Sequence, residues 1–184
     1  PTINEKFLIH VFIDPVDFLI NYKILINRTV INVYDLESLK KVKTLQLAPE
    51  CPVQKVSNMC FTCDSKGMAI LSCEPDAFIT IYSFEKPDLM VTGRASNKNY
   101  PGRATLLQCN PGDISMVTVG GDNMLKIMNK TEKGFGQLGT VKGENIVVTA
   151  LTWLTPEIII AGSADMELYF VETGELKAKY NIAN

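Results

Sequence analysis

Three features of the sequence have residue types and spacings that could support chemistry, and the first is glycine-rich. The segment GFGQLG at residues 134–139 fits the G-x-G-x-x-G pattern of phosphate-binding loops. Such a loop needs its glycines between a strand and the N-terminus of a helix, or above a hairpin with a lysine strand and a catalytic loop elsewhere. No helical pattern follows residue 139, and the His-Arg-Asp and Asp-Phe-Gly motifs of kinases are absent. We therefore interpret the segment as a glycine-rich connection between outer strands.

The second feature is a C-x-x-C pair, Cys60 and Cys63. A structural zinc site needs four ligands, usually from two such pairs, and the other cysteines, Cys51, Cys73 and Cys109, are scattered. In a strand, Cys60 and Cys63 would also point to opposite faces. The odd number of cysteines, spread through apolar strand patterns, predicts free buried thiols in the reducing cytoplasm.

The third feature is His10, the single histidine, which a Ser-His-Asp or Cys-His site would require. It lies in the apolar run 7–13, and we interpret it as a packed or interface residue. The acidic pairs Glu74 with Asp76, and Asp165 with Glu167, each share a turn and are interpreted as solvated loop charges. We therefore expect no catalytic, metal-binding or cofactor-binding residues, and a protein that is not an enzyme.

Composition limits the partners. A content of 46% hydrophobic and 21% charged residues is ordinary for a globular protein. A net charge of −2 gives no domain-wide basic field, so nucleic acid is not an expected partner. No apolar run approaches the roughly 20 residues of a membrane span, so a membrane is not expected either.

The elements that would position these residues repeat along the chain. Four apolar runs, at residues 31–35, 79–83, 125–129 and 168–172, align with Tyr34, Tyr82, Met128 and Val171 in one register. These four residues are separated by 48, 46 and 43 positions. Such a period is typical of four-stranded units in propellers.

Each unit contains three further strands around this run. An alternating first strand places Phe61, Leu107 and Trp153 in equivalent core positions. The second strands, 68–73, 114–119 and 158–161, precede turns that hold Asp76, Asp122 and Asp165; the more polar fourth strands, 41–47, 88–92, 135–141 and 175–180, suit an outer edge. In the first unit, 18–21 or 23–27 supplies the second strand, and 7–13 is either its first strand or part of a preceding unit.

The sequence thus predicts an all-β fold, a β-propeller of about four blades, with no convincing helix. The predicted blades cover approximately residues 7–47, 56–96, 103–143 and 147–184. Four blades are few for such a fold, so we expect a section of a larger propeller with exposed edges at 7–13 and near Asn184.

The units resemble WD repeats, in which the third strand ends in Trp-Asp, and this resemblance implies that the propeller is WD40-like. Tyr34-Asp35 is the nearest match, whereas Tyr82-Ser83, Met128-Asn129 and Val171-Glu172 are degenerate, and no Gly-His pair precedes them. The side-chain network of well-kept WD repeats is therefore not expected here. Blade stability should depend on apolar packing instead.

The segments DSKG at 64–67, NPGD at 110–113, VTVGGDNMLK at 117–126, LTW at 151–153 and IIAG at 159–162 resemble the first propeller of the cilia- and flagella-associated WD-repeat proteins. That resemblance implies an axonemal scaffold, in the cilium or flagellum, that positions inner dynein arms and related complexes on doublet microtubules. Its implied partners are axonemal complexes, dynein arm components and tubulin.

Two alternatives share the fold. One is an intracellular WD-repeat scaffold of a trafficking or RNA-associated complex, which differs only in its partners. The other is a ligand-binding or enzymatic propeller with its site in the central channel. The latter needs convergent polar ligands on the innermost strands, and the strand 158–161, interpreted as an inner strand, offers none.

A scaffold would bind partners through its loops and blade edges. The longest candidate loop, 97–103, contributes the predicted interaction residues Asn97, Lys98, Asn99, Tyr100 and Arg103. A basic run at 40–43 adds Lys40, Lys41 and Lys43, either as a solvated edge strand or as a contact with an acidic surface such as that of tubulin.

Overall fold

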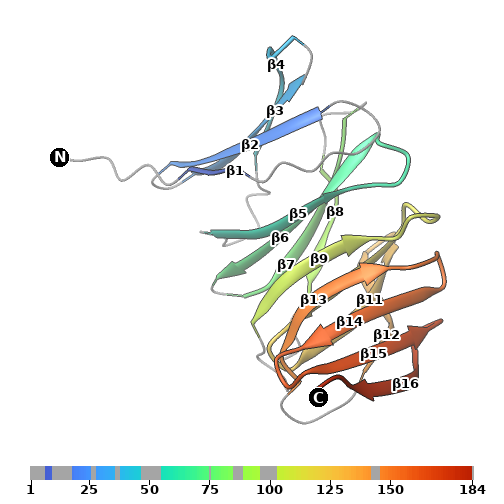
Figure 1. Ribbon diagram of the computed structural model, residues 1–184. Helices are drawn as coiled ribbons and strands as arrows, with labels where there is room; N and C mark the ends of the chain where they lie inside the picture. Colours follow the sequence, from blue (N-terminus) through green and yellow to red (C-terminus); the bar gives the residue numbers. More distant parts are fainter. Residues whose placement is uncertain are drawn as a thin grey trace.

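The chain folds into strands that alternate with short turns. The computed structural model describes residues 7–9, 18–25, 28–35, 38–46, 55–74, 76–84, 89–95, 103–141 and 146–183. Sixteen strands lie in these ranges and form four antiparallel sheets of four strands, each in chain order (Figure 1). Within the described ranges no helix has the length and apolar character needed to cross a membrane.

The sheets are numbered 1 to 4 along the chain. Sheet 1 contains β1 (Phe7–Ile9), β2 (Phe18–Leu25), β3 (Arg28–Asp35) and β4 (Lys41–Gln46), and sheet 2 contains β5 (Lys55–Phe61), β6 (Gly67–Glu74), β7 (Phe78–Ser83) and β8 (Leu89–Arg94). Sheet 3 contains β9 (Ala104–Cys109), β10 (Met116–Gly121), β11 (Met124–Thr131) and β12 (Gly134–Thr140). Sheet 4 contains β13 (Val148–Trp153), β14 (Ile158–Ser163), β15 (Glu167–Glu172) and β16 (Glu175–Asn181).

Sheet 1 resolves two alternatives that the sequence left open. Residues 18–25 form one continuous second strand, β2, which pairs with β3. Phe7–Ile9 pairs with the other side of β2, so it is the first strand of the same sheet. The neighbouring His10 lies outside the described residues.

The predicted register of the third strands is confirmed. In sheets 2 to 4, the third-strand residues Tyr82, Met128 and Val171 each lie opposite a residue of the second strand. On its other side, that second-strand residue lies opposite the last residue of the first strand. In each of the four sheets, the pairing of the third strand with the fourth strand has a β-bulge directly before the aligned residue, which is Tyr34 in sheet 1. The extra residue always lies in the fourth strand, at Val42, Met90, Leu138 and Lys177.

The first strands show one error in the predicted alignment. Phe61, Cys109 and Trp153 are the equivalent last residues, because the next amide in each sheet donates a hydrogen bond to the carbonyl near the start of the second strand. Leu107, which the sequence aligned with them, lies two residues earlier. The error arose because residues 110–113 were matched to the turn 64–67 by composition. Residue 110 directly follows β9, whereas residue 64 lies three positions after the end of β5.

The first strands lie innermost. β9 contacts both β5 and β13, whereas β8 and β12 are outer neighbours. The strand at 158–161, predicted to be an inner strand, is therefore the second strand of sheet 4, and that interpretation was wrong. The predicted outer position of the fourth strands is confirmed, and β16 is almost entirely exposed.

The core consists of apolar layers between successive sheets. One buried cluster joins sheets 1 and 2 around Ile31 and Met68, and a second joins sheets 2 and 3 around Leu71 and Val119. A third, around Ile159, joins sheets 3 and 4. Because side chains alternate along each strand, both faces of sheets 2 and 3 are covered in this way. The sheets therefore stack face to face, as blades do.

The stack of four sheets has two ends, at which different strand connections lie. End A holds the connections at 62–66, 110–115 and 154–157, between first and second strands, and the tight turns at 132–133 and 173–174. End B holds the connections between second and third strands. Asp76, Asp122 and Asp165 lie there, as predicted.

The glycine-rich segment is a strand and not a connection between strands. It forms β12, the predicted fourth strand of sheet 3, and no helix follows it. A Cβ on Gly139 would lie 2.6 Å from the Cα atom and carbonyl oxygen of Gly174 in sheet 4. A glycine at 139 therefore lets the backbones of two neighbouring sheets approach closely.

Candidate interaction site between the third and fourth sheets

The structure describes four of the predicted interaction residues, Arg103, Lys40, Lys41 and Lys43, and it places Arg103 away from the lysines. Residues 97–100 lie outside the described residues, and Arg103 is exposed at end B, just before β9. Lys40 and Lys41 are exposed at the other end, where β3 connects to β4.

Lys43 has a different environment from the rest of its basic run. Its Nζ atom donates hydrogen bonds to the carbonyl oxygens of Ser83, at 3.5 Å, and Phe84. The same atom lies 5.9 Å from the centroid of the Phe84 ring. The half-buried ammonium group thus connects sheet 1 to sheet 2, and only Lys40 and Lys41 present an exposed positive charge in this run.

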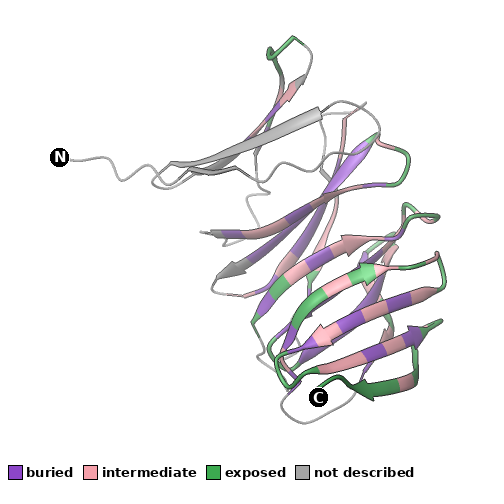
Figure 2. Cartoon of the chain, viewed as in Figure 1, coloured by how far each residue is buried: buried purple, intermediate pink, exposed green. Residues whose placement is uncertain are grey.

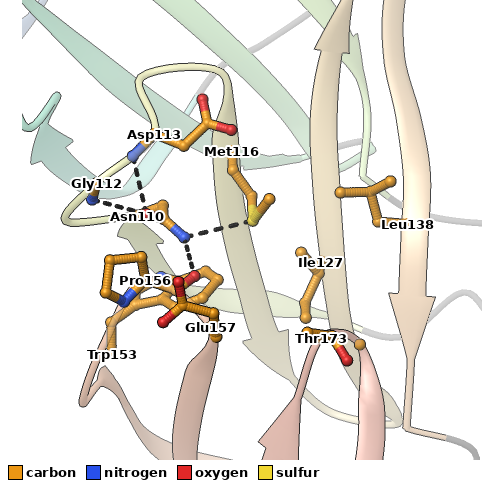
Figure 3. Close-up of a pocket in the computed structure, with 11 residues that line it drawn as sticks. Asn110, Gly112, Asp113, Met116, Ile127, Leu138, Trp153, Pro156, Glu157 and Thr173 are labelled. Carbon is orange, nitrogen blue, oxygen red and sulfur yellow. Dashed lines mark hydrogen bonds between the residues drawn. The ribbon is translucent and has the colours of Figure 1, made fainter.

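A site that the sequence did not indicate lies at end A, between sheets 3 and 4 (Figure 3). It is a cavity of about 400 Å³. Two connections from different sheets, 110–115 and 154–157, form one side, and strands β11 and β12 with the turn at 173–174 form the other. Its lining consists of Asn110, Gly112, Asp113, Met116, Ile127, Leu138, Trp153, Pro156, Glu157, Thr173 and Gly174.

Asn110 fixes the shape of this site. Its Oδ1 atom accepts hydrogen bonds from the amides of Gly112, at 2.7 Å, and Asp113, at 2.9 Å, as in an Asx-turn. Its Nδ2 atom donates to the carbonyl oxygen of Pro156 in sheet 4, at 2.7 Å, and lies 3.4 Å from the Met116 sulfur. One buried amide therefore holds both the turn of sheet 3 and its contact with sheet 4.

A second contact at the same place depends on the absence of a side chain. A Cβ on Gly112 would lie 2.7 Å from Cγ of Pro156. This close approach, together with the hydrogen bond from Asn110, sets the spacing of the two connections. The cavity follows from the way two blades meet, so no single run of sequence encodes it.

The walls of the cavity are mostly apolar. Met116, Ile127, Leu138 and Trp153 come from four different strands (Figure 3). The Leu138 side chain is 55% exposed although it lies beside a buried core. The indole nitrogen of Trp153 is buried without a hydrogen-bond partner among the described residues. Such walls favour an apolar group over water.

Two carboxyl groups give the cavity its charge. Glu157 is exposed, and its Oε2 atom accepts a hydrogen bond from the Thr155 hydroxyl at 3.1 Å. Asp113 is half-buried, and its Oδ1 atom accepts hydrogen bonds from the amide and hydroxyl of Ser115. No lysine or arginine is among the lining residues. The cavity therefore suits an apolar side chain that stands beside a positive charge.

Trp153 and the segment 110–113 were interpreted from the sequence as purely structural. Trp153 was predicted to be a core residue, and the segment 110–113 to be a turn. Trp153 does pack against the apolar cluster between sheets 3 and 4, but it is only partly buried because its other side forms a cavity wall. An asparagine followed by Pro-Gly-Asp was a turn signal, and nothing in it showed which second turn it would contact.

The thiols differ from the prediction in one respect. Cys63 is exposed, because it lies in the turn after β5 and not in the strand, so its predicted burial was wrong. Cys60 and Cys109 are half-buried free thiols. Cys51 lies outside the described residues, and Cys73 lies in β6. Within the part of the chain that the structure describes, no group of three or more His, Cys, Asp or Glu side chains could hold a metal ion.

Glu167 is not a solvated loop charge. It begins β15, its side chain is only 18% exposed, and its carboxylate forms an ion pair with Lys179 at 2.8 Å. Hydrogen bonds from Lys179 and from the Tyr169 hydroxyl lower the pKa of this carboxyl group. Asp76, interpreted in the same way from the sequence, pairs with Arg94 at 3.0 Å.

Comparison with known proteins supports the fold and a ciliary resemblance. No protein-family model matches the chain. The mouse protein cilia- and flagella-associated protein 57 is 25% identical over 157 residues, a match that covers 84% of this chain but only 12% of that protein. The chain thus spans a small part of the length of this curated relative.

A solved structure shows the same architecture. The β-propeller domain of Cps50 (Swd1) from Myceliophteria thermophila superposes with a TM-score of 0.75 at 12% identity, over 100% of this chain and 59% of that one. This chain therefore has the fold of a WD-repeat β-propeller, with four blades corresponding to the four sheets, and it resembles the cilia- and flagella-associated WD-repeat proteins.

Proposed function

We propose that this chain is part of a non-catalytic scaffold that binds other proteins in the axoneme of cilia or flagella. The similarity to mouse cilia- and flagella-associated protein 57, over most of this chain, is the observation that carries the proposal. In its more detailed form, the scaffold positions dynein arm components and associated complexes on doublet microtubules. A propeller suits this role because it presents many loops on a rigid framework.

We also propose that the chain is one section of a larger propeller, with blades at about residues 7–47, 56–96, 103–143 and 147–184. The outer face of the fourth blade supports this. Buried and partly exposed residues alternate along β14 and β15, as Figure 2 shows. Ile160 and Phe170 pair across these strands on the partly exposed face, and Phe170 contacts the exposed Tyr180. An apolar sheet face of this kind is covered by the next blade in a propeller.

The cavity between the third and fourth blades is the proposed docking site for a partner. Its apolar walls and its two carboxylates favour a protein segment that places an apolar side chain next to a lysine or arginine. The anchor would contact Leu138 and Trp153, and the cation would lie near Glu157. Because the site is preformed by the Asn110 hydrogen bonds, little conformational entropy is lost when a partner binds.

Localisation of the intact protein tests the scaffold role. A fluorescently tagged copy, expressed in ciliated or flagellated cells of the source organism, should stay with the axoneme after detergent extraction. Recovery of the protein only in the detergent-soluble fraction, or only in the cell body, would contradict the axonemal assignment.

A matched pair of variants tests the docking site. Leu138 and Leu154 are both exposed leucines, at 55% and 61%, but only Leu138 lines the cavity. Leu138→Asp should lower axonemal retention about tenfold or more, the effect of at least about 1.4 kcal/mol of lost binding free energy. Leu154→Asp should retain the protein. Equal behaviour of the two variants would show that the cavity is not the docking site.

A further inference from the structure

Two thiols from neighbouring blades face each other where the first strands of the second and third blades meet. Cys60 is on β5 and Cys109 is on β9, the innermost strands of the second and third blades. Their Sγ atoms lie 2.8 Å apart, although the residues are 49 positions apart in the sequence. The C-x-x-C pattern pairs Cys60 with Cys63 along the sequence, but the structure brings Cys60 to Cys109 instead.

The packing of the two blades holds these sulfur atoms in place. Both cysteines pack against the apolar cluster that joins sheets 2 and 3. Close by, the Asn58 side-chain amide donates a hydrogen bond to the Thr105 carbonyl oxygen at 3.2 Å, which fixes β5 against β9. Farther out, the Lys126 ammonium group donates to the Ala95 carbonyl oxygen at 3.0 Å, across the same pair of blades. A covalent S–S bond is about 2.05 Å long, so only a small movement separates this contact from a disulfide.

We propose that Cys60 and Cys109 form a reversible disulfide between the second and third blades, by exchange with a small-molecule disulfide such as oxidised glutathione. One protein thiolate attacks a sulfur of the small disulfide, which forms a mixed disulfide and releases one small thiolate. The second protein thiolate then attacks the protein sulfur of the mixed disulfide and releases the second small thiolate. The two thiol protons pass to the released thiolates. The protein is oxidised by two electrons and the small disulfide is reduced to two thiols.

The surroundings of the pair slow this reaction. Burial, together with the hydrogen bond to Cys109, raises the pKa of the Cys60 thiol well above its ordinary value. The Cys60 thiolate is therefore scarce at neutral pH, so exchange at this thiol should be slow and should become faster as the pH rises. Exposed Cys63 lies in the adjacent turn and provides a comparison for a thiol that reagents reach freely.

Peptide mapping tests the bond directly. The purified protein is incubated with oxidised glutathione, its remaining thiols are alkylated, and it is digested with trypsin without reduction. The tryptic peptides 56–66 and 104–126 should be recovered joined, and should separate on reduction. Peptide 56–66 contains both Cys60 and Cys63, so the mapping is repeated in Cys63→Ser, where the joined pair should persist. It should be lost in Cys60→Ser and Cys109→Ser.

Thermal unfolding provides a second measurement. The bond closes a loop of about fifty residues in the unfolded chain, so the oxidised protein should unfold roughly 5–10 °C above the reduced protein. Cys109→Ser should show no such difference. Two results would overturn the proposal. One is glutathione attached only to Cys63, with no joined peptides in the wild-type protein or in Cys63→Ser. The other is joined peptides that persist in Cys60→Ser and are lost in Cys63→Ser.

Discussion

Replacing Asn110 tests whether one buried amide holds the third and fourth blades together. Asn110→Ala removes the acceptor for the amides of Gly112 and Asp113 and the donor to the Pro156 carbonyl oxygen. The methyl group of alanine cannot form any of these three hydrogen bonds. We expect the variant to fold, with a lower free energy of unfolding and a wider cavity.

The magnitude follows from the bonds that are lost. Each hydrogen bond contributes about 0.5–1.5 kcal/mol net, so three would contribute about 1.5–4.5 kcal/mol. Gly112 and Pro156 are exposed, so water can replace part of what they lose. We therefore expect a decrease of about 2–3 kcal/mol, or roughly 5–10 °C in Tm for a chain of this length.

The assay is urea and thermal unfolding of the wild-type protein and three variants. Gln137→Ala is the control, because Gln137 is exposed on β12, and it should differ little from wild type. Asn110→Asp keeps the acceptor for the turn but places a carboxylate against the Pro156 carbonyl oxygen. Its deficit should shrink as the pH falls through the pKa of the new carboxyl group, because the protonated acid can donate to that oxygen. An Asn110→Ala variant as stable as Gln137→Ala would refute the reasoning.

Two further predictions concern contacts between blades. Gly139→Ala should lower the free energy of unfolding by about 1–3 kcal/mol in a urea titration, because its Cβ would overlap the backbone of Gly174. Gly136→Ala, on the same strand with only ordinary van der Waals neighbours, should have a much smaller effect. Burial lowers the pKa of Lys126, so between that lowered pKa and the ordinary lysine value of about 10.4 the unfolded chain binds more protons than the folded chain. Stability of the wild type relative to Lys126→Met should therefore rise with pH in this range, and a flat difference between the two pH–stability curves would contradict it.

The sequence predicted the repeating part of the fold well. Apolar runs with a shared register marked the third strands, because every blade needs the same alternation to cover its two faces. The polar fourth strands indicated the outer edge, because an edge strand is more exposed to solvent than the strands inside a sheet. The sequence assigned Leu107 to the wrong position because turns between first and second strands differ in length, and composition alone does not fix where a turn begins.

Features that depend on contacts between blades could not be predicted. The approach of Cys109 to Cys60 and the bond from Asn110 to Pro156 join residues more than forty positions apart. Their partners follow from the stacking of sheets, which a period along the chain does not specify. Glu167 was misjudged for a related reason, since its partner Lys179 lies on the neighbouring strand.

The β-bulge that recurs in the fourth strands affects all four blades and not only the blade whose bulged residue lines the cavity. An extra residue interrupts the alternation of side chains, so the bulged position is released from the pattern that the core imposes on its neighbours. Leu138 is that residue in the third blade, and it lines the cavity. Val42, Met90 and Lys177 occupy the same place in the other blades. Each blade thus has one fourth-strand position that has no opposite residue in the third strand, so its residue type is not set by the cross-strand pairing of the sheet.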